Sequence, residues 1–265
     1  MKLAIVKLGG SVITDKSRQL TFNAAIMKQL ASEIETALSF DRELRCIIVH
    51  GAGSYGHYKA ARYRLQGMNG FSAKKHFLEV RNDVRALNHK VIEVLLNAGV
   101  EACAVPPENI FRFSNGKAAP VEREHISAFL QAGVMPVTFG DVVYDSTLLL
   151  TIVSGDLLML ELSRIFRPHL SIFCTDVDGV YTSNPKLNRG AEMIRNLTPG
   201  MHVSTVSSKV LDVTGEMGGK LNTLLDIASH SSRTLVINGL VRGRLKKALL
   251  GHDVTGTSVS VGDNK

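Results

Sequence analysis

The feature that most constrains the fold of this chain is an apolar run that ends in glycines. Cys46–Val49 predicts a buried strand, and residues 50–57 follow it with three glycines among small residues and a histidine at the end. Glycines at the carboxyl end of a strand let a backbone approach a ligand, and successive N–H groups in such a turn can hold an anion. The pattern therefore predicts a phosphate site.

The glycines of residues 51–56 also fit the G-x-G-x-x-G spacing of dinucleotide-binding proteins. That spacing is informative in the first strand–helix turn, with an acidic residue about 20 positions later at the end of the next strand. Here an earlier strand at 3–8 already ends in its own glycine turn, and the acidic candidates Glu79 and Asp83 lie in a helical pattern. A nicotinamide cofactor is the weaker interpretation.

Strand and helix patterns alternate along the chain. Strands are expected at 3–8, 46–49, 102–105, 134–139, 170–175, 234–237 and 258–261, and helices at 26–38, 74–97, 126–130, 157–165, 221–227 and 245–250. Two hairpins are expected at 109–121 and 142–153, and a lid at 62–72. This order predicts an α/β fold: an open, mostly parallel, twisted sheet sandwiched by helices, with β-hairpin excursions.

Composition excludes several classes of protein. The chain has 265 residues, 45% apolar and 21% charged, which is typical of a soluble globular protein. It contains no run of about 18 apolar residues, and Met1 leads directly into the first strand, so we expect no transmembrane helix and no signal peptide. Three cysteines in apolar surroundings favour reduced thiols and a cytoplasmic location.

The net charge of +7 comes from scattered basic residues, apart from a group at 242–247 that we interpret as a solvated helix face. A nucleic-acid-binding surface would need a basic face or a recognisable module, and neither is evident. We expect a small-molecule substrate and no nucleic-acid or membrane partner.

Four glycine-bearing turns follow strands, at 7–11, 50–57, 154–156 and 214–220. Ligands of open α/β sheets bind outside the carboxyl ends of the strands, so the first two turns can face one crevice. Singly, Lys7, His57 and Asp156 have ordinary interpretations as a solvated strand end, a helix cap and an N-cap. Together, beside glycine turns, they favour an anion-handling site.

Residues 214–220 are similar to a Walker A loop, but Thr214 replaces the first glycine and Leu221 replaces the final Ser/Thr. Lys220 can still meet phosphate at a helix N-terminus. Asp176 and Asp178 have no ligand set of recognisable spacing around them, so we predict a turn or a nucleotide contact there and no metal ligands.

Five motifs then occur in a familiar order: Lys7-Leu-Gly-Gly-Ser11, the 50–57 turn, Ser154-Gly155-Asp156, Thr-Asp-Val-Asp-Gly-Val-Tyr at 175–181, and Asp212–Gly215. Along nearly its whole length the chain resembles the amino acid kinase superfamily, of which the 175–181 string is a specific signature. Within it the chain most resembles the isopentenyl phosphate kinases, because of residues 9–16 and His57. Fosfomycin kinases have a similar histidine.

The resemblance implies ATP-dependent phosphorylation of isopentenyl phosphate to isopentenyl diphosphate, with Mg²⁺, by a homodimer. It implies one domain over 1–265, with an acceptor lobe at about 1–167 and a nucleotide lobe at about 168–265. The implied catalytic residues are Lys7, Lys16, His57, Asp156 and Lys220. The implied ATP-binding residues are Lys7, Gly9, Gly10, Ser11, Gly53, Asp176, Tyr181, Gly215 and Lys220. The implied acceptor-binding residues are Ala52, Gly53, Gly56, His57, Ser154 and Gly155.

One departure and two alternatives accompany this expectation. Glu216 stands where the family often has glycine, and it adds a negative charge near the nucleotide phosphates. The first alternative is a kinase of the same fold acting on fosfomycin or an acidic amino acid. The second is a non-catalytic nucleotide-binding sensor or storage protein.

Overall fold

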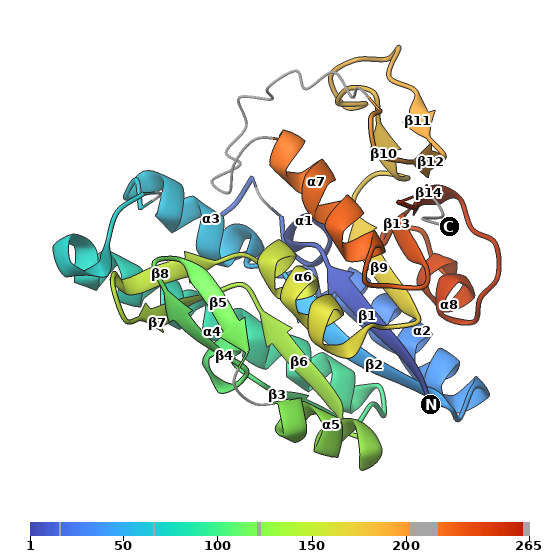
Figure 1. Ribbon diagram of the computed structural model, residues 1–265, viewed down its shortest axis with the longest axis horizontal. Coiled ribbons are helices and arrows are strands. Elements are labelled where there is room, and N and C mark those ends of the chain that lie inside the picture. The colour runs from blue at the N-terminus through green and yellow to red at the C-terminus, as the bar shows by residue number, and fades with distance from the viewer. Residues whose placement is uncertain (16, 66, 121–122, 202–216, 262–265) are drawn as a thin grey trace.

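A computed structural model of the chain describes residues 1–15, 17–65, 67–120, 123–201 and 217–261. Its centre is an eight-stranded sheet in the order β12-β14-β13-β9-β1-β2-β6-β3 (Figure 1). The strands are β1 (Lys2–Leu8), β2 (Leu44–His50), β3 (Ala102–Ala104), β6 (Met135–Phe139), β9 (Leu170–Thr175), β12 (Asn196–Leu197), β13 (Thr234–Asn238) and β14 (Gly256–Val259). Neighbouring strands pair in parallel except β13 with β14. The predicted open, mostly parallel α/β sheet is confirmed.

Alternation along β1 separates the two layers of helices that cover the sheet. Ala4, Val6 and Leu8 lie in one buried core, whereas Leu3 and Ile5 lie in another on the opposite face. The first core includes α2 (Ala24–Phe40), α4 (Gly70–Asn97) and α8 (Arg244–Leu249); the second includes α5 (Arg123–Gln131), α6 (Gly155–Phe166) and α7 (Met217–Ala228). The sheet is thus buried on both sides, which explains its apolar strands.

The long helix α4 begins at Gly70, four residues before the predicted helix at 74–97. The side chain of Asn69 caps it by accepting a hydrogen bond from the N–H of Ser72 at 3.1 Å. Gly99 follows its end with φ +86°, a left-handed conformation that glycine adopts without steric cost.

Both predicted hairpins are confirmed: β4 (Phe111–Ser114) pairs with β5 (Lys117–Pro120), and β7 (Asp141–Asp145) pairs with β8 (Leu149–Val153). The carboxylate of Asp145 joins the two hairpins, because it accepts the N–H groups of Asn115 and Gly116 at 3.0 and 2.8 Å. Between the β7–β8 hairpin and α4 lies a third apolar core, which includes Phe77, Val80, Val84, Phe139, Val142 and Leu150.

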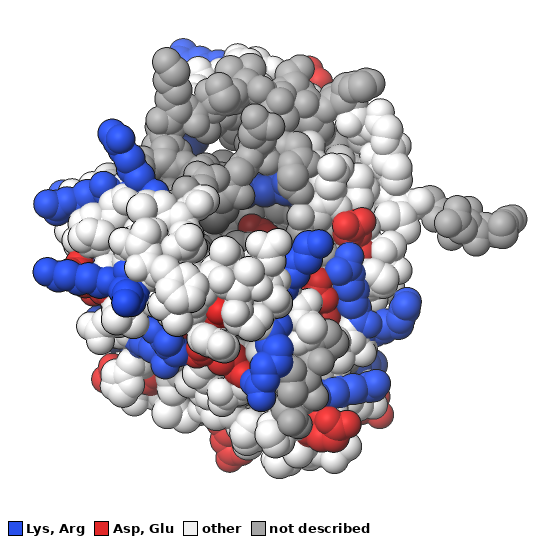
Figure 2. Space-filling model, turned by 60° about the vertical axis from the view of Figure 1, so that its left-hand side comes forward, with Lys and Arg blue, Asp and Glu red and all other residues white. Residues whose placement is uncertain are grey.

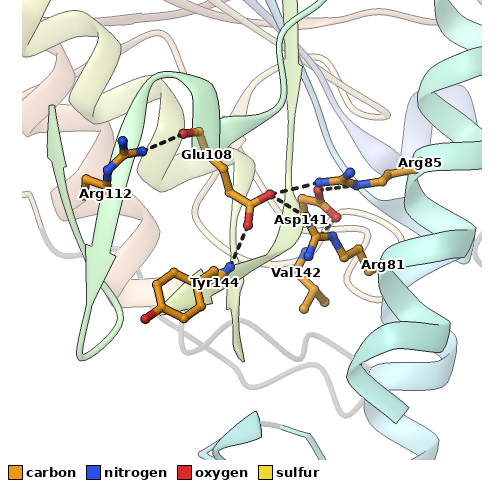
Figure 3. Close-up of polar contacts among 7 residues, drawn as sticks. All are labelled: Arg81, Arg85, Glu108, Arg112, Asp141, Val142 and Tyr144. Atoms are coloured by element: carbon orange, nitrogen blue, oxygen red, sulfur yellow. Dashed lines mark hydrogen bonds and ion pairs between the residues drawn. The ribbon is translucent and has the colours of Figure 1, made fainter. Parts of the chain in front are cut away.

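A charged cluster borders this third core (Figure 3). Arg85 Nε lies 3.1 Å from Asp141 Oδ2, and Glu108 accepts from Arg85 Nη2 at 3.1 Å and Arg81 Nη2 at 2.5 Å. Glu108 belongs to the 3₁₀ helix η1 (Pro107–Asn109) and also accepts the N–H of Tyr144 at 2.8 Å. The cluster therefore ties α4 to the β7 strand through η1.

The predicted turn at 50–57 is partly wrong, because most of it belongs to helix α3 (Gly53–Arg62). Only Gly51 and Ala52 form the turn, and the carbonyl of Ala52 already accepts the N–H of Gly56 at 3.2 Å. A Cβ on Gly56 would lie 2.5 Å from the Cβ of Ala52 and 3.3 Å from Val84 of α4. This glycine thus allows close helix packing rather than a turn.

Smaller differences from the prediction lie in short elements. A single helical turn, α1 (Gly10–Ile13), follows β1, and the small ribbon of β10 (Val180–Tyr181) and β11 (Met193–Ile194) follows β9. Residues 62–72, predicted as a lid, begin at the last residue of α3 and end in the first turn of α4. The lid and the division into two lobes near Pro168 stay predictions.

Candidate functional site

The site is built at the carboxyl ends of three adjacent strands, where β1 lies between β2 and β9 (Figure 1). All three run in the same direction, so the loops that follow them meet at one edge of the sheet. Leu8 pairs with His50 on one side and with Cys174 on the other. The turns predicted at 7–11 and 50–57 are therefore neighbours in space.

The first two glycine loops pack backbone against backbone. A Cβ on Gly10 would lie 2.6 Å from both N and Cα of Gly53, and a Cβ on Gly51 would lie 2.7 Å from N of Gly10. Gly53 also has φ +49°. On the other side, a Cβ on Gly9 would lie 2.6 Å from the carbonyl oxygen of Cys174. A side chain at Gly10, Gly51 or Gly53 would push the two loops apart, and a side chain at Gly9 would push the first loop away from β9.

Lys7 continues the alternation of Leu3 and Ile5, so its side chain extends toward the α6 face. Its Nζ lies 2.5 Å from Oδ1 of Asp156, with 16% and 26% of the two side chains exposed. It also lies 5.8 Å above the ring of Phe173, close enough for a cation–π contact. A lysine held in place and still open to solvent is suited to meeting an anion.

The start of α6 holds the partner of Lys7. Ser154, not Asp156, is the N-cap: its side chain accepts the N–H of Leu157 at 3.2 Å. Asp156 lies two residues later, in the first helical turn. Gly155 lies directly beside Lys7, because a Cβ on this glycine would be in van der Waals contact with Cε of the lysine at 3.4 Å.

The signature string after β9 contacts the first glycine loop directly. Oδ1 of Asp176 accepts a hydrogen bond from Oγ of Ser11 at 3.0 Å, and Lys186 forms an ion pair with the same carboxylate. Burial raises the pKa of Asp176, but the hydrogen bond and charge of Lys186 together with Ser11 outweigh it and hold the pKa below its usual value. Sequence reasoning missed Lys186, which lies beyond the 175–181 motif.

Two other residues of that string lie slightly farther along. Asp178 accepts from Nη1 of Arg244 at 2.5 Å and from Asn238 at 3.2 Å, contacts that tie this turn to α8 and β13. These contacts favour the turn interpretation of Asp178. Tyr181 is half-buried in β10, opposite Met193.

The remaining predicted residues are placed by the helices that hold them. His57 is half-buried in α3, next to Gly56 and one turn beyond the glycine turn. Lys220 is half-buried near the start of α7, which packs against α6 and β13. Lys16 and Gly215, like Glu216, lie outside the described residues. The catalytic and binding roles of all these residues stay predictions.

His50 is a histidine of the site that sequence reasoning left aside. It is fully buried, stacks on Phe139, and places Nδ1 3.2 Å from the carbonyl of Gly51 and Nε2 3.2 Å from Oδ1 of Asn88. Burial lowers its pKa to about 4, against the opposing effect of both hydrogen bonds. The imidazole of His50 is therefore neutral, and its contact with the carbonyl of Gly51 helps to fix the glycine turn.

The described residues contain no group of three or more His, Cys, Asp or Glu side chains arranged to hold a metal ion. Within the same residues, every helix is too short or too polar to cross a membrane. Lys and Arg side chains are spread among acidic ones over the face in Figure 2 rather than gathered in one basic patch.

Comparisons with known proteins agree with this geometry. The family model described as "Amino acid kinase family" matches residues 2–238. Isopentenyl phosphate kinase of Methanothermobacter thermautotrophicus is 35% identical over 267 residues, covering 97% of this chain and 99% of that protein. Isopentenyl phosphate kinase of Methanocaldococcus jannaschii is 30% identical, covering 97% and 98%.

A solved structure extends the comparison to the fold. The crystal structure described as "X-ray structures of isopentenyl phosphate kinase" superposes with a TM-score of 0.82 at 35% identity, over 97% of this chain and all of the other. Sequence motifs, sheet order and whole-chain similarity thus agree with the predicted resemblance. The chain belongs to the amino acid kinase family.

Proposed function

We propose that this protein transfers the γ-phosphate of ATP to isopentenyl phosphate, giving isopentenyl diphosphate and ADP. The observation that carries the proposal is the backbone contact between the glycine loops after β1 and β2, with Lys7 beside them at the same edge. Two loops in contact can hold two phosphates next to each other. The isopentenyl phosphate kinases among its relatives, similar over nearly the whole chain, support this acceptor.

The donor side of the site is formed by the loop after β1. The N–H groups of Gly10 and Ser11 face the γ-phosphate in this proposal, whereas the N–H of Gly9 donates to the carbonyl of Cys174 at 3.0 Å and fixes the loop against β9. Asp176 and Tyr181 contact the rest of the nucleotide. Lys7, with Lys16 and Lys220, neutralises the phosphoryl group in transit. Phosphoryl transfer depends mainly on such positioning and charge neutralisation.

The acceptor side is formed by the turn after β2 and the first turns of α3. His57 holds the phosphate of isopentenyl phosphate, which rests against Ala52, Gly53 and Gly56. Ser154 and Gly155 close the site from the α6 side. The apolar tail lies along the 62–77 segment and α4, where Phe77 and Val80 belong to the third core.

The reaction is a direct in-line displacement. An oxygen of the acceptor phosphate forms a bond to the γ-phosphorus as the bond from that phosphorus to the β,γ-bridging oxygen breaks, and ADP leaves with those electrons. The acceptor is a phosphate monoester that is largely ionised near neutral pH, so it needs no strong general base. Asp156 keeps Lys7 oriented toward the transferred group.

Magnesium enters the proposal on the phosphates of ATP. Mg²⁺ commonly binds through substrate phosphates and waters, with one or two carboxylates at most. The described residues offer no cage of ligands, which agrees with an ion that the nucleotide brings. We also propose that the protein is cytoplasmic and forms a homodimer. Light scattering on the purified protein measures the oligomeric state.

The test is a panel of acceptors with MgATP, read by phosphorus NMR. The panel contains isopentenyl phosphate, fosfomycin, glutamate, aspartate and N-acetylglutamate. A β-phosphorus signal of a new diphosphate monoester with isopentenyl phosphate alone is the expected result. A phosphorylated product from another acceptor overturns the proposed substrate, and measurable ATP binding without turnover on any acceptor favours a sensor or storage protein.

A further inference from the structure

One buried hydroxyl links the two glycine loops. Thr14 follows α1, only 2% of it is exposed, and its Oγ1 donates a hydrogen bond to the carbonyl of Gly10 at 2.5 Å. The same oxygen accepts the N–H of Ser54, in the first turn of α3, at 2.9 Å. A single side-chain atom is thus bonded to the donor-side loop and to the acceptor-side helix.

The residues around the Thr14 hydroxyl pack closely against it. A Cβ on Gly53 would collide with Thr14 and would lie 2.8 Å from the carbonyl of Gly10, so the three residues are in close contact. Ser54 is itself 3% exposed, and its N–H is one of the helix N-terminal donors that have no partner within the helix. Thr14 supplies that partner from the other loop.

Ser54 adds a second connection to the segment that follows Thr14. Its Oγ accepts the N–H of Thr21 at 3.1 Å, while its own N–H donates to Thr14. The start of α3 is therefore fastened to both ends of the segment between Thr14 and Thr21. Movement of the acceptor-side helix away from the donor-side loop would break both of these bonds.

We propose that Thr14 is a positioning residue that sets the distance between the ATP-side loop and the acceptor-side turn. The proposal rests on the proposed transfer between those two loops. An in-line transfer requires the two reacting phosphates to be held at near-attack distance, and a misplacement of about 1 Å can cost about 10²-fold in rate. Thr14 touches neither substrate in this account and acts only through Gly10 and Ser54.

The test uses a matched pair of variants at this position. Thr14→Val keeps the shape and removes the hydroxyl, so we expect kcat to fall roughly 10- to 100-fold, with both KM values changed less than about threefold. Thr14→Ser keeps the hydroxyl and should retain kcat within about threefold of the wild type. Each substrate still binds its own loop, which is why the loss is expected in kcat.

Thr257→Val is the control for a purely structural effect. Thr257 is fully buried, and its hydroxyl likewise joins two segments, accepting the N–H of Val180 at 2.8 Å and donating to the carbonyl of Ile194 at 2.6 Å. Its loss should lower the melting temperature about as much as Thr14→Val, with kcat within about threefold of the wild type. Equal losses of kcat in the two valine variants would overturn the positioning role.

A readout on the free protein separates this inference from the identity of the acceptor. Amide hydrogen exchange of Ser54 should accelerate at least about 10-fold in Thr14→Val and stay slow in Thr14→Ser, since it reports the bond directly. If wild-type protein does not phosphorylate isopentenyl phosphate, the proposed substrate fails, and the kinetic comparison is made on whichever panel acceptor turns over. Unchanged Ser54 exchange, or full kcat in Thr14→Val, overturns the role of Thr14.

Discussion

Strand β1 carries a lysine–aspartate pair at each end, and the two pairs differ in solvent exposure and in the length of sequence that they span. At the amino end, Nζ of Lys2 lies 2.9 Å from Asp41, with 52% of the lysine side chain exposed. At the carboxyl end, Nζ of Lys7 lies 2.5 Å from Asp156, with 16% exposed. The first pair spans 39 residues of sequence and the second spans 149.

The difference shows what the direction of a parallel sheet does to its side chains. The amino end of β1 meets the segments that lead into β2 and β9: the N–H of Lys2 donates to the carbonyl of Glu43, and the N–H of His169 donates to the carbonyl of Leu3. The carboxyl end meets loops from β2, β9 and α6, which belong to distant parts of the chain. A lysine is therefore a solvated surface residue at one end and part of an enclosed site at the other.

The largest effect should come from removing the lysine at the carboxyl end. Lys7→Met should lower kcat about 10²- to 10³-fold, the scale on which loss of one preorganised charge stabiliser acts. The matched control is Lys2→Met on the same strand, which should leave kcat and both KM values unchanged. Steady-state kinetics with MgATP and the panel acceptor measure both, and equal effects of the two variants would remove Lys7 from the site.

The next effect concerns His57, on the proposed acceptor side of the same edge. His57→Ala should lower kcat/KM for isopentenyl phosphate about 10²-fold, with KM for ATP nearly unchanged, because in the proposed arrangement the imidazole contacts the acceptor phosphate and not the nucleotide. His125→Ala, at an exposed position of α5, is the control and should behave as the wild type. Normal kinetics in His57→Ala would show that another group holds the acceptor phosphate.

Asp141 provides a second contrast with Lys7. It begins β7 just beyond the carboxyl end of β6. Its side chain is fully buried beside Arg85, and burial raises its pKa from 3.8 to about 6 in spite of that arginine (Figure 3). This carboxylate lies at the same edge as Lys7 but faces α4 and the third core. Asp141 should therefore affect the free energy of unfolding and not the rate of phosphoryl transfer.

The pH dependence of unfolding tests that distinction. Because the native state holds the Asp141 proton more tightly than the unfolded chain, its contribution to stability is complete below about pH 4 and is lost as the pH rises through about 6. The free energy of unfolding of the wild type, relative to Asp141→Asn, should fall by about 2 kcal/mol between pH 4 and pH 6. Urea unfolding at a series of pH values measures it.

Asp145, at the other end of β7, gives the opposite sign. Burial raises its pKa, but N–H donors from Gly116, Leu148 and other residues outweigh burial and hold the pKa below its usual value. Its contribution is present above the unfolded pKa and is lost as the pH falls. Relative to Asp145→Asn, wild-type stability should therefore decline only in the acid range, and matching slopes in the two series would contradict both assignments.

The same comparison shows how far sequence reasoning reaches. The sheet, both hairpins and the meeting of the 7–11 and 50–57 turns follow from local patterns, because parallel strands bring their carboxyl ends to one edge. Lys7 was found in this way, since a charged residue next to a glycine turn at a strand end is visible in the sequence. Its pairing with Asp156 spans 149 residues, and no local pattern in the sequence predicts it.

What sequence reasoning missed depends on contacts between distant segments. The sequence predicts that Gly56 forms a turn. In the structure this glycine instead allows α3 to pack closely against Val84 of α4, a contact that no local pattern reveals. The pairing of Arg85 with Asp141 spans 56 residues and carries no local pattern. Thr14 was likewise passed over, because a threonine after a glycine loop is ordinary until Ser54 is seen to donate to it.

The smallest effect on the kinetics is expected at Lys186, which lies beyond the carboxyl end of β9. Lys186 forms an ion pair with Asp176 as Lys7 does with Asp156, but 59% of its side chain is exposed, and exposed ion pairs contribute little. Lys186→Met should raise KM for ATP by no more than about threefold and leave kcat unchanged, whereas Asp176→Asn, which also loses the contact with Ser11, should raise KM for ATP further. If Lys186→Met instead lowers kcat as strongly as Lys7→Met, the importance of a lysine at this edge does not depend on how buried its side chain is. Lys186 would then contact the transferred phosphate itself.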